Sequence, residues 1–201
     1  MEHETPFRIL VLAGFIGTLL IAVPHRVRSW ESKEPLDRRQ EGVFILATLR
    51  PIALFLWLGI FAYMINPRWM GWSSLPLPDW LRWTGALVFV AGLWLMSATL
   101  RALGPNLTDT VVTRQEHTLV TGGPYRWVRH PFYVVMALLV LAIGLIAANW
   151  FILLAGAVVF TLLAVRSNTE EEHLLKRFGE PYERYRETTG RFLPKPRSTR
   201  Q

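Results

Sequence analysis

Long apolar stretches alternate with polar, arginine-rich segments along the sequence. A helix that crosses the hydrocarbon core of a bilayer needs about 20 mostly apolar residues. Four stretches approach or exceed this length: residues 7–24, 43–65, 83–100 and 132–165. The last is too long for one crossing, because a helix that rises about 1.5 Å per residue would overshoot a core of about 30 Å. The pattern therefore predicts a polytopic membrane protein.

Polar Asn149 interrupts the fourth stretch, and it is followed by Trp150, a residue type common at the membrane–water boundary. These two residues predict a turn at residues 147–150. The stretch then folds as a helical hairpin with spans at about 132–147 and 150–165. We therefore predict an all-α fold with five transmembrane helices.

The whole chain, residues 1–201, is predicted to form one membrane domain, and its basic residues predict the orientation. Most of the 22 lysines and arginines lie in the C-terminal tail and in the loops at 26–42 and 101–131, whereas the opposite loops hold only Arg68 and Arg82. By the positive-inside rule the N-terminus lies outside and the tail in the cytoplasm. Orientation and attraction to anionic lipids thus explain the basic charge, and no nucleic-acid partner is expected.

Composition and the first residues agree with this reading. Hydrophobic residues make up 51% of the chain and charged residues 18%, and no cysteine is present. The lack of cysteine excludes disulfide scaffolds, thiolate nucleophiles and cysteine-built metal sites. The leader Met1–Glu4 is acidic, and no small-residue cleavage site follows the first span. We therefore expect a retained anchor rather than a secretory signal.

The segment after the last span is too polar to cross a membrane but follows a helical pattern. Its apolar positions recur every three or four residues and so share one helix face: Leu174, Phe178, Tyr182 and Tyr185. Gly179 and Pro181 interrupt the pattern. We therefore expect two short amphipathic helices that lie against the membrane or the bundle.

Polar residues that topology does not require gather at two places on the predicted cytoplasmic side. In the third loop, Gly122 and Gly123 permit close approach of a ligand, and Pro131 suits the first turn of a helix whose N-terminus attracts a carboxylate. Possible donors stand nearby: His117, Arg126, Arg129 and His130. Alternatively, these arginines are ordinary positive-inside anchors and the second histidine is an interfacial cap.

The second place is the exit of the fifth span, where Arg166 precedes Glu170 and Glu171. A carboxylate at a membrane boundary is costly to desolvate unless it is paired, which favours a functional role over a solvated charge run. Both ends of a hairpin return to the same face. The loop ahead of Phe132 and the helix after Val165 must therefore be neighbours, and we expect them to form one pocket.

At these residues the sequence resembles integral-membrane methyltransferases of the isoprenylcysteine carboxyl methyltransferase type, which are related to phospholipid N-methyltransferases. HTLVTGGPY at 117–125 and RHPFY at 129–133 are similar to the family's H-x-L-V-x-x-G-P-Y and R-H-P-x-Y elements. Residues 166–171 resemble its R-x3-E-E element, and residues 178–185 its F-G-x2-Y-x2-Y element. The resemblance covers roughly residues 100–195.

The resemblance implies S-adenosylmethionine as methyl donor, held by residues 101–133 and 166–195 rather than by a Rossmann domain. It implies a cofactor site formed by His117, Leu119, Val120, Gly123, Tyr125, Arg129, His130, Pro131, Tyr133 and Glu171. It places the catalytic residues Arg166 and Glu170 at the substrate end. The sequence departs from the family at Val134–Val135 and at residues 103–111, near where the substrate would arrive, so the methyl acceptor stays open.

We expect direct in-line methyl transfer, which needs alignment and exclusion of water, and no metal. An ionised carboxylate needs only to be oriented, and Arg166 is the candidate for this. An amine or a thiol must lose a proton, which Glu170 would accept. The resemblance favours a lipophilic, isoprenylcysteine-like carboxylate, but a phospholipid amine, a thiol or another hydrophobic molecule is also consistent with the sequence. The sequence does not indicate the oligomeric state.

Two other functions compete. Membrane sterol reductases share the general architecture and an aromatic C-terminal pattern but bind NADPH, and the glutamate pair disfavours them. A small transporter or assembly protein would use Arg50 and the glutamates to line a path. Arg50 precedes Pro51 inside an apolar stretch, where we favour a structural role.

Overall fold

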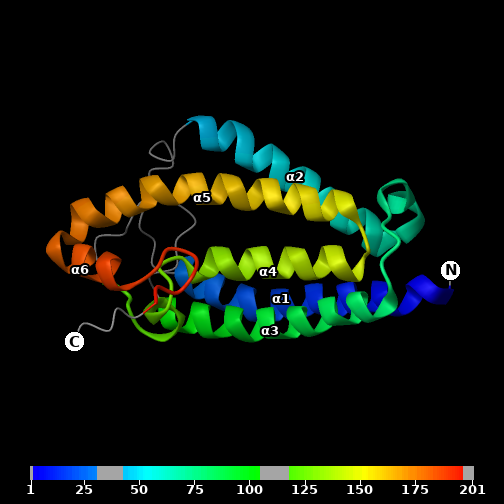
Figure 1. Cartoon of the computed structure of the whole chain (residues 1–201), viewed down its shortest axis with the longest axis horizontal. Helices are drawn as coiled ribbons and strands as arrows, with labels where there is room; N and C mark the ends of the chain where they lie inside the picture. The colour runs from blue at the N-terminus through cyan, green and yellow to red at the C-terminus, as the bar shows by residue number, and fades with distance from the viewer. Residues whose placement is uncertain (1, 31–42, 105–117, 197–201) are drawn as a thin grey trace.

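The computed structural model describes residues 2–30, 43–104 and 118–196, which form an elongated helical bundle (Figure 1). Its elements are η1 (Glu2–Glu4), α1 (Thr5–Trp30), α2 (Val43–Ile65), η3 (Pro67–Ser73), α3 (Asp79–Leu103), η5 (Gly123–Arg126), α4 (Pro131–Ile146), α5 (Trp150–Phe178) and α6 (Glu180–Thr188). These residues form no β-strand, which confirms the predicted all-α fold.

Each of the five predicted spans corresponds to one helix. Four segments are long and apolar enough to cross a membrane: Thr5–Val27, Ala47–Ile65, Asp79–Leu103 and Trp150–Phe178. The helix α4 is apolar but has only 16 residues. At 1.5 Å per residue it is about 24 Å long, less than the thickness of a typical hydrocarbon core. The first half of the hairpin is therefore a short helix held inside the bundle.

The helix α5 extends beyond its predicted end. It does not stop near Val165 but continues unbroken to Phe178, so the first of the two short helices expected after the last span is part of α5. Gly179, at a φ of 59°, ends the helix, and α6 follows it as predicted. The glutamates of the tail thus stand on a rigid helix rather than on a separate segment.

The helix α4 lies at the centre of the bundle, between α3 and α5 (Figure 1). Glycines allow the neighbouring helices to come close. A Cβ atom at Gly92 of α3 would lie 2.7 Å from Leu139 Cδ2, and one at Gly156 of α5 would lie 2.4 Å from Val140 Cγ1. Small residues at helix interfaces permit this kind of tight packing in membrane proteins. The position of α4, and hence of the loop that leads into it, is fixed from both sides.

The predicted turn between α4 and α5 is confirmed, and Asn149 holds it in place. The Asn149 side chain caps α5 by accepting a hydrogen bond from the Ile152 amide at 3.1 Å. Its amide nitrogen donates to the Ser73 hydroxyl at 2.8 Å and to the Met70 carbonyl at 3.2 Å. The single polar residue Asn149 thus joins the hairpin turn to η3. The side chains of Asn149, Ser73 and Met70 are all buried.

Arg82 was expected in a loop, and this expectation is wrong, because the residue lies in the first turn of α3 and is only 3% exposed. Its guanidinium donates to both carboxylate oxygens of Glu4, at 2.8 and 2.7 Å, and to the Ile146 carbonyl at 2.9 Å. Its Cζ atom also lies 3.6 Å from the centre of the Phe7 ring. These contacts fasten η1 and the start of α1 to the start of α3 and the end of α4. The hydrogen bonds from Arg82 lower the pKa of Glu4.

Replacing Arg82 with alanine should destabilise the protein by about 2 to 3 kcal/mol. This is less than the cost of breaking a fully buried pair, because the Glu4 side chain keeps 39% of its exposure. Thermal unfolding in detergent would measure the loss, with the exposed Arg68→Ala as the matched control. Equal melting temperatures for the two variants would show that this cluster does not anchor α1.

Candidate active site

The two motif regions meet at the end of the bundle that carries α6 (Figure 1). Arg129 and His130 directly precede α4, and Glu170 and Glu171 stand on α5 across the hairpin. The Nε2 atom of His130 lies 3.0 Å from Glu171 Oε1, which shows that the two regions are in direct contact. The predicted proximity of the two hairpin ends is therefore present in the structure.

Glu171 is the centre of a buried ion cluster and is 5% exposed. Arg129 donates hydrogen bonds to its carboxylate from Nε at 2.9 Å and from Nη2 at 3.2 Å. Arg191 donates hydrogen bonds to the same carboxylate from Nε at 3.1 Å and from Nη2 at 2.9 Å. Together with the His130 contact, these bonds satisfy both oxygens, which a carboxylate needs if it is to stay charged when buried. The hydrogen bonds between Arg191 and Glu171 raise the pKa of Arg191.

A short C-terminal segment, Thr189–Phe192, completes the cluster; we call it the strap. The Arg129 amide donates to the Gly190 carbonyl at 2.8 Å, and the His130 amide donates to the Arg191 carbonyl at 3.1 Å. The Arg129 guanidinium also donates to the Thr189 carbonyl. The strap turns sharply at Gly190, where a Cβ atom would lie 1.8 Å from the Leu193 carbonyl oxygen, so only glycine fits.

Glu170 has a different environment from its neighbour, because its side chain remains 31% exposed. The Tyr133 hydroxyl donates to its Oε2 atom at 2.8 Å. The Tyr133 ring stacks on His130 with 5.4 Å between centroids and 10° between planes. His130 Nδ1 lies 3.8 Å from the same Glu170 oxygen. Adjacent glutamates thus have distinct positions, one enclosed in the ion cluster and one facing open space.

The loop ahead of α4 contributes aromatic and backbone groups. The Tyr185 hydroxyl of α6 donates to the Tyr125 carbonyl at 2.6 Å, which ties η5 to α6. Burial raises the pKa of both phenols, so they remain neutral donors. Gly123 has a φ of 59°, and a Cβ atom there would approach Ala102 to 2.9 Å, so glycine lets η5 pass close to the end of α3.

A cavity of about 560 Å³ opens from this polar cluster into the bundle. Its polar end is lined by Arg129, His130, Tyr133, Arg166 and Glu170. Its other walls come from five helices and are mostly apolar, although Thr18 and Arg26 of α1 also line the cavity. The apolar lining residues include Phe15, Leu56, Trp57, Ile60, Phe89, Leu139, Ile143 and Gly156. The cavity therefore joins a charged end to a long hydrophobic compartment within the part of the bundle that is expected to lie in the membrane.

Most of the predicted site residues line this cavity, namely Leu119, Val120, Tyr125, Arg129, His130, Tyr133, Arg166 and Glu170. Gly123, Pro131 and Glu171 are not among the lining residues. His117 falls outside the described residues. Arg50 is exposed on α2 and does not line the cavity.

Sequence reasoning missed Arg191 and its partner Asn168. The Arg191 Nη1 atom donates to Asn168 Oδ1 at 2.7 Å, one turn ahead of Glu171 on α5. In the sequence Arg191 is one of many basic residues of the tail, and nothing there distinguishes it from an ordinary positive-inside charge. The preceding Gly190 was the one available signal, because a glycine marks a possible turn.

The chain is similar to known membrane methyltransferases in sequence and in fold. A sequence model of the phospholipid methyltransferase family matches residues 80–181 of the chain. Protein-S-isoprenylcysteine O-methyltransferase of Schizosaccharomyces pombe is 33% identical over 115 residues, which cover 55% of this chain and 49% of that protein. The protein of the same name from Homo sapiens is 32% identical over 126 residues, which cover 61% of this chain and 44% of that protein. The chain thus spans about half the length of the curated relatives it matches.

The fold is also similar to a solved structure, that of the eukaryotic intramembrane Ras methyltransferase, an isoprenylcysteine carboxyl methyltransferase. The TM-score is 0.59 at 20% sequence identity, and the match covers 92% of this chain and 62% of the other. At this identity the likeness concerns the fold alone. The region matched by the family model runs from the start of α3 to the start of α6 and so contains both glutamates.

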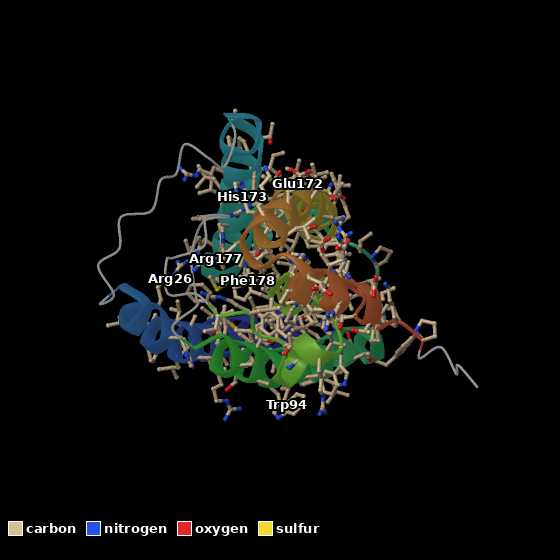
Figure 2. The ribbon with its side chains drawn as sticks, turned by 90° about the vertical axis from the view of Figure 1, so that its left-hand side faces the viewer. Arg26, Trp94, Glu172, His173, Arg177 and Phe178 are labelled. Carbon is tan, nitrogen blue, oxygen red and sulfur yellow. The ribbon has the colours of Figure 1, made fainter. Side chains whose placement is uncertain are left out.

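Replacing Glu171 with glutamine should destabilise the protein by about 3 kcal/mol, because two arginines would then face a neutral amide. The neighbouring Glu172 is exposed on the same helix (Figure 2), so Glu172→Gln is the matched control. Thermal unfolding in detergent measures both. If the two variants unfold at the same temperature, the ion cluster does not hold the site together.

Proposed function

Because the chain belongs to the phospholipid methyltransferase family, we propose that it is an S-adenosylmethionine-dependent methyltransferase that acts on a lipophilic acceptor in the membrane. The observation that carries the proposal is the cavity, whose charged end meets a hydrophobic compartment. A water-soluble acceptor would not need such a compartment. A molecule with a reactive polar group and a long apolar part fits both ends.

The polar end of the cavity suits S-adenosylmethionine. The whole cavity, with a volume of about 560 Å³, lies within the range of 300 to 1,000 Å³ that is usual for ligand sites. The His130 and Tyr133 rings and the half-buried Tyr125 supply aromatic surface, and Leu119 and Val120 supply apolar contact. When bound there, S-adenosylmethionine supplies a methyl group on a positively charged sulfur. His117, Gly123 and Pro131 join the cofactor site in the proposal by family resemblance.

Arg129 and Glu171, which the family resemblance assigns to the cofactor site, also hold the wall of that site in place. Nearly all N–H groups of Arg129 are engaged by Glu171 and by the carbonyls of Arg186 and Thr189. Glu171 in turn is enclosed by its three partners. The cluster therefore holds His130 in the cavity wall.

Arg166 and Glu170 are the groups proposed to act on the acceptor, and both line the cavity. Arg166 orients a carboxylate acceptor by charge. Glu170 receives the proton of an amine or thiol acceptor, and the Tyr133 hydroxyl keeps its carboxylate aimed at the cavity. The relatives named above act on isoprenylcysteine by name, so an isoprenylcysteine-like carboxylate is the acceptor we favour.

The hydrophobic walls do more than bind the tail of the acceptor. They keep water away from the reacting groups, which favours transfer to the acceptor over reaction with water. They also hold the acceptor in one orientation, and alignment of the two reactants is the main source of rate in a direct displacement. The chain's residues thus align and shield, and no metal is required.

We further propose that the site faces the cytoplasm. The basic loops and the tail carry most of the lysines and arginines, and η5, α6 and the strap gather at that same end of the bundle (Figure 1). By the positive-inside rule this end is cytoplasmic and the end with η1 and η3 lies outside.

The alternative functions are not favoured. The relatives and the similar fold carry methyltransferase names, which argues against a sterol reductase that binds NADPH. A transport path lined by Arg50 and the glutamates conflicts with the position of Arg50 away from the cavity.

Purified protein should bind S-adenosylmethionine and its demethylated product saturably in calorimetry. Glu170→Gln and Arg166→Ala should retain this binding within about threefold. Turnover should nevertheless fall by about 100-fold, in Arg166→Ala for a carboxylate acceptor and in Glu170→Gln for an amine or thiol. Glu172→Gln serves as the control. Normal turnover in both site variants would refute the assignment of these residues.

Filling the hydrophobic compartment should weaken the use of long acceptors. Ala53 of α2 lines the cavity, and the next residue, Leu54, is 58% exposed on the outer face. Ala53→Trp should lower transfer to an acceptor with a long apolar chain about tenfold and leave the affinity for S-adenosylmethionine unchanged, whereas Leu54→Trp should do neither. Equal rates in the two variants would mean that the acceptor lies elsewhere.

A further inference from the structure

The strap contacts α5 through two side chains: the Phe192 ring, whose centroid lies 5.4 Å from that of Phe160, and the Arg191 guanidinium, which makes the polar contacts. Its Nη1 atom contacts Asn168, and its Nε and Nη2 atoms contact Glu171 one turn later. Two contacts on successive turns of a helix resist rotation of that helix about its axis. Arg129 contacts Glu171 as well but makes no contact with Asn168 among the described residues, so the second contact comes from Arg191.

Rotation of α5 matters for the cavity because Glu170 immediately precedes Glu171. Successive residues on a helix point about 100° apart, so the direction of one carboxylate sets that of the other. With Glu171 drawn into the ion cluster, Glu170 faces Tyr133, whose hydroxyl is 2.8 Å from its Oε2 atom. Arg166 stands one turn before Glu170 and would turn with it.

We propose that Arg191 is a positioning residue for the reaction: by holding Asn168 and Glu171 it sets the rotation of α5, and through it the direction of Glu170 and Arg166 toward the acceptor. This makes the strap a functional part of the site, although it does not line the cavity. The proposal rests on the proposed function for its kinetic consequence, but its geometric consequence is independent of any cofactor.

The location of Arg191 accounts for a separation between binding and turnover. His130 and its amide stay attached through Arg129, Glu171 and the strap carbonyls when the Arg191 side chain is removed. The wall proposed to bind the cofactor is therefore retained. The groups proposed to face the acceptor lose the contact at Asn168, which restrains their angle on a second turn of α5, so turnover should fall more than cofactor affinity.

The first experiment follows the Tyr133–Glu170 contact without any cofactor. The chain has five tyrosines, so protein labelled with ¹³C at the phenol carbon Cζ gives few signals. The signal of Tyr133 is the one that is lost in the variant Tyr133→Phe. In Arg191→Gln this signal should move toward its position in Glu170→Gln. In Arg184→Gln, which removes an exposed arginine paired with Glu180 on α6, it should stay at the wild-type position.

The second experiment measures kinetics on the same variants. Arg191→Gln should lower kcat about tenfold and change the Kd for S-adenosylmethionine less than threefold, and Arg191→Lys should recover part of kcat. A merely structural role would lower the melting temperature without separating kcat from Kd. The double variant Glu171→Gln, Arg191→Gln should lose no more kcat than the worse single variant, because both act through one contact.

The outcomes separate this inference from the proposed function. An unchanged Tyr133 signal and an unchanged kcat in Arg191→Gln would overturn the positioning role, while cofactor binding by the wild type would still support a methyltransferase. A shifted Tyr133 signal in a protein that binds no S-adenosylmethionine would overturn the proposed function and support the positioning role by geometry.

Discussion

A carboxylate buried at the end of a membrane helix is stable only when cations and hydrogen-bond donors surround it. Glu171 meets this requirement with partners from two separate parts of the chain: Arg129 and His130 ahead of α4, and Arg191 beyond α6. Because the glutamate itself belongs to α5, one charge draws together the loop, the long helix and the tail. The shape of the polar end of the cavity depends on this requirement.

The hairpin makes such a cluster possible, and packing at the other end keeps it in register. The short helix α4 is held between α3 and α5 by close contacts at glycines, and its turn is fastened to η3 through Asn149. Arg82 adds a second paired charge where α1 begins. With both ends fixed, the space between the helices stays open as a hydrophobic cavity that ends at Glu170.

Much of the fold could be predicted from the sequence, because spans are set by length and apolarity and the α4–α5 turn is marked by Asn149 and Trp150. The adjacency of the motif regions followed from hairpin topology. Other features depend on contacts between residues far apart in the chain. Arg82 pairs with Glu4 although α1 and α2 lie between them in the sequence, and Arg191 joins a cluster that no local pattern in the tail reveals. The continuity of α5 was missed because the change from apolar to polar residues marks the membrane boundary and not the end of the helix.

A methyl donor and a lipophilic acceptor are proposed to meet at the charged end of this cavity. The most direct test is an experimental structure of the protein with S-adenosylhomocysteine, the demethylated product, bound. We expect the sulfur of this product inside the cavity, close to Glu170 and facing the hydrophobic walls. The product bound at another surface, with the cavity closed to it, would contradict this proposal.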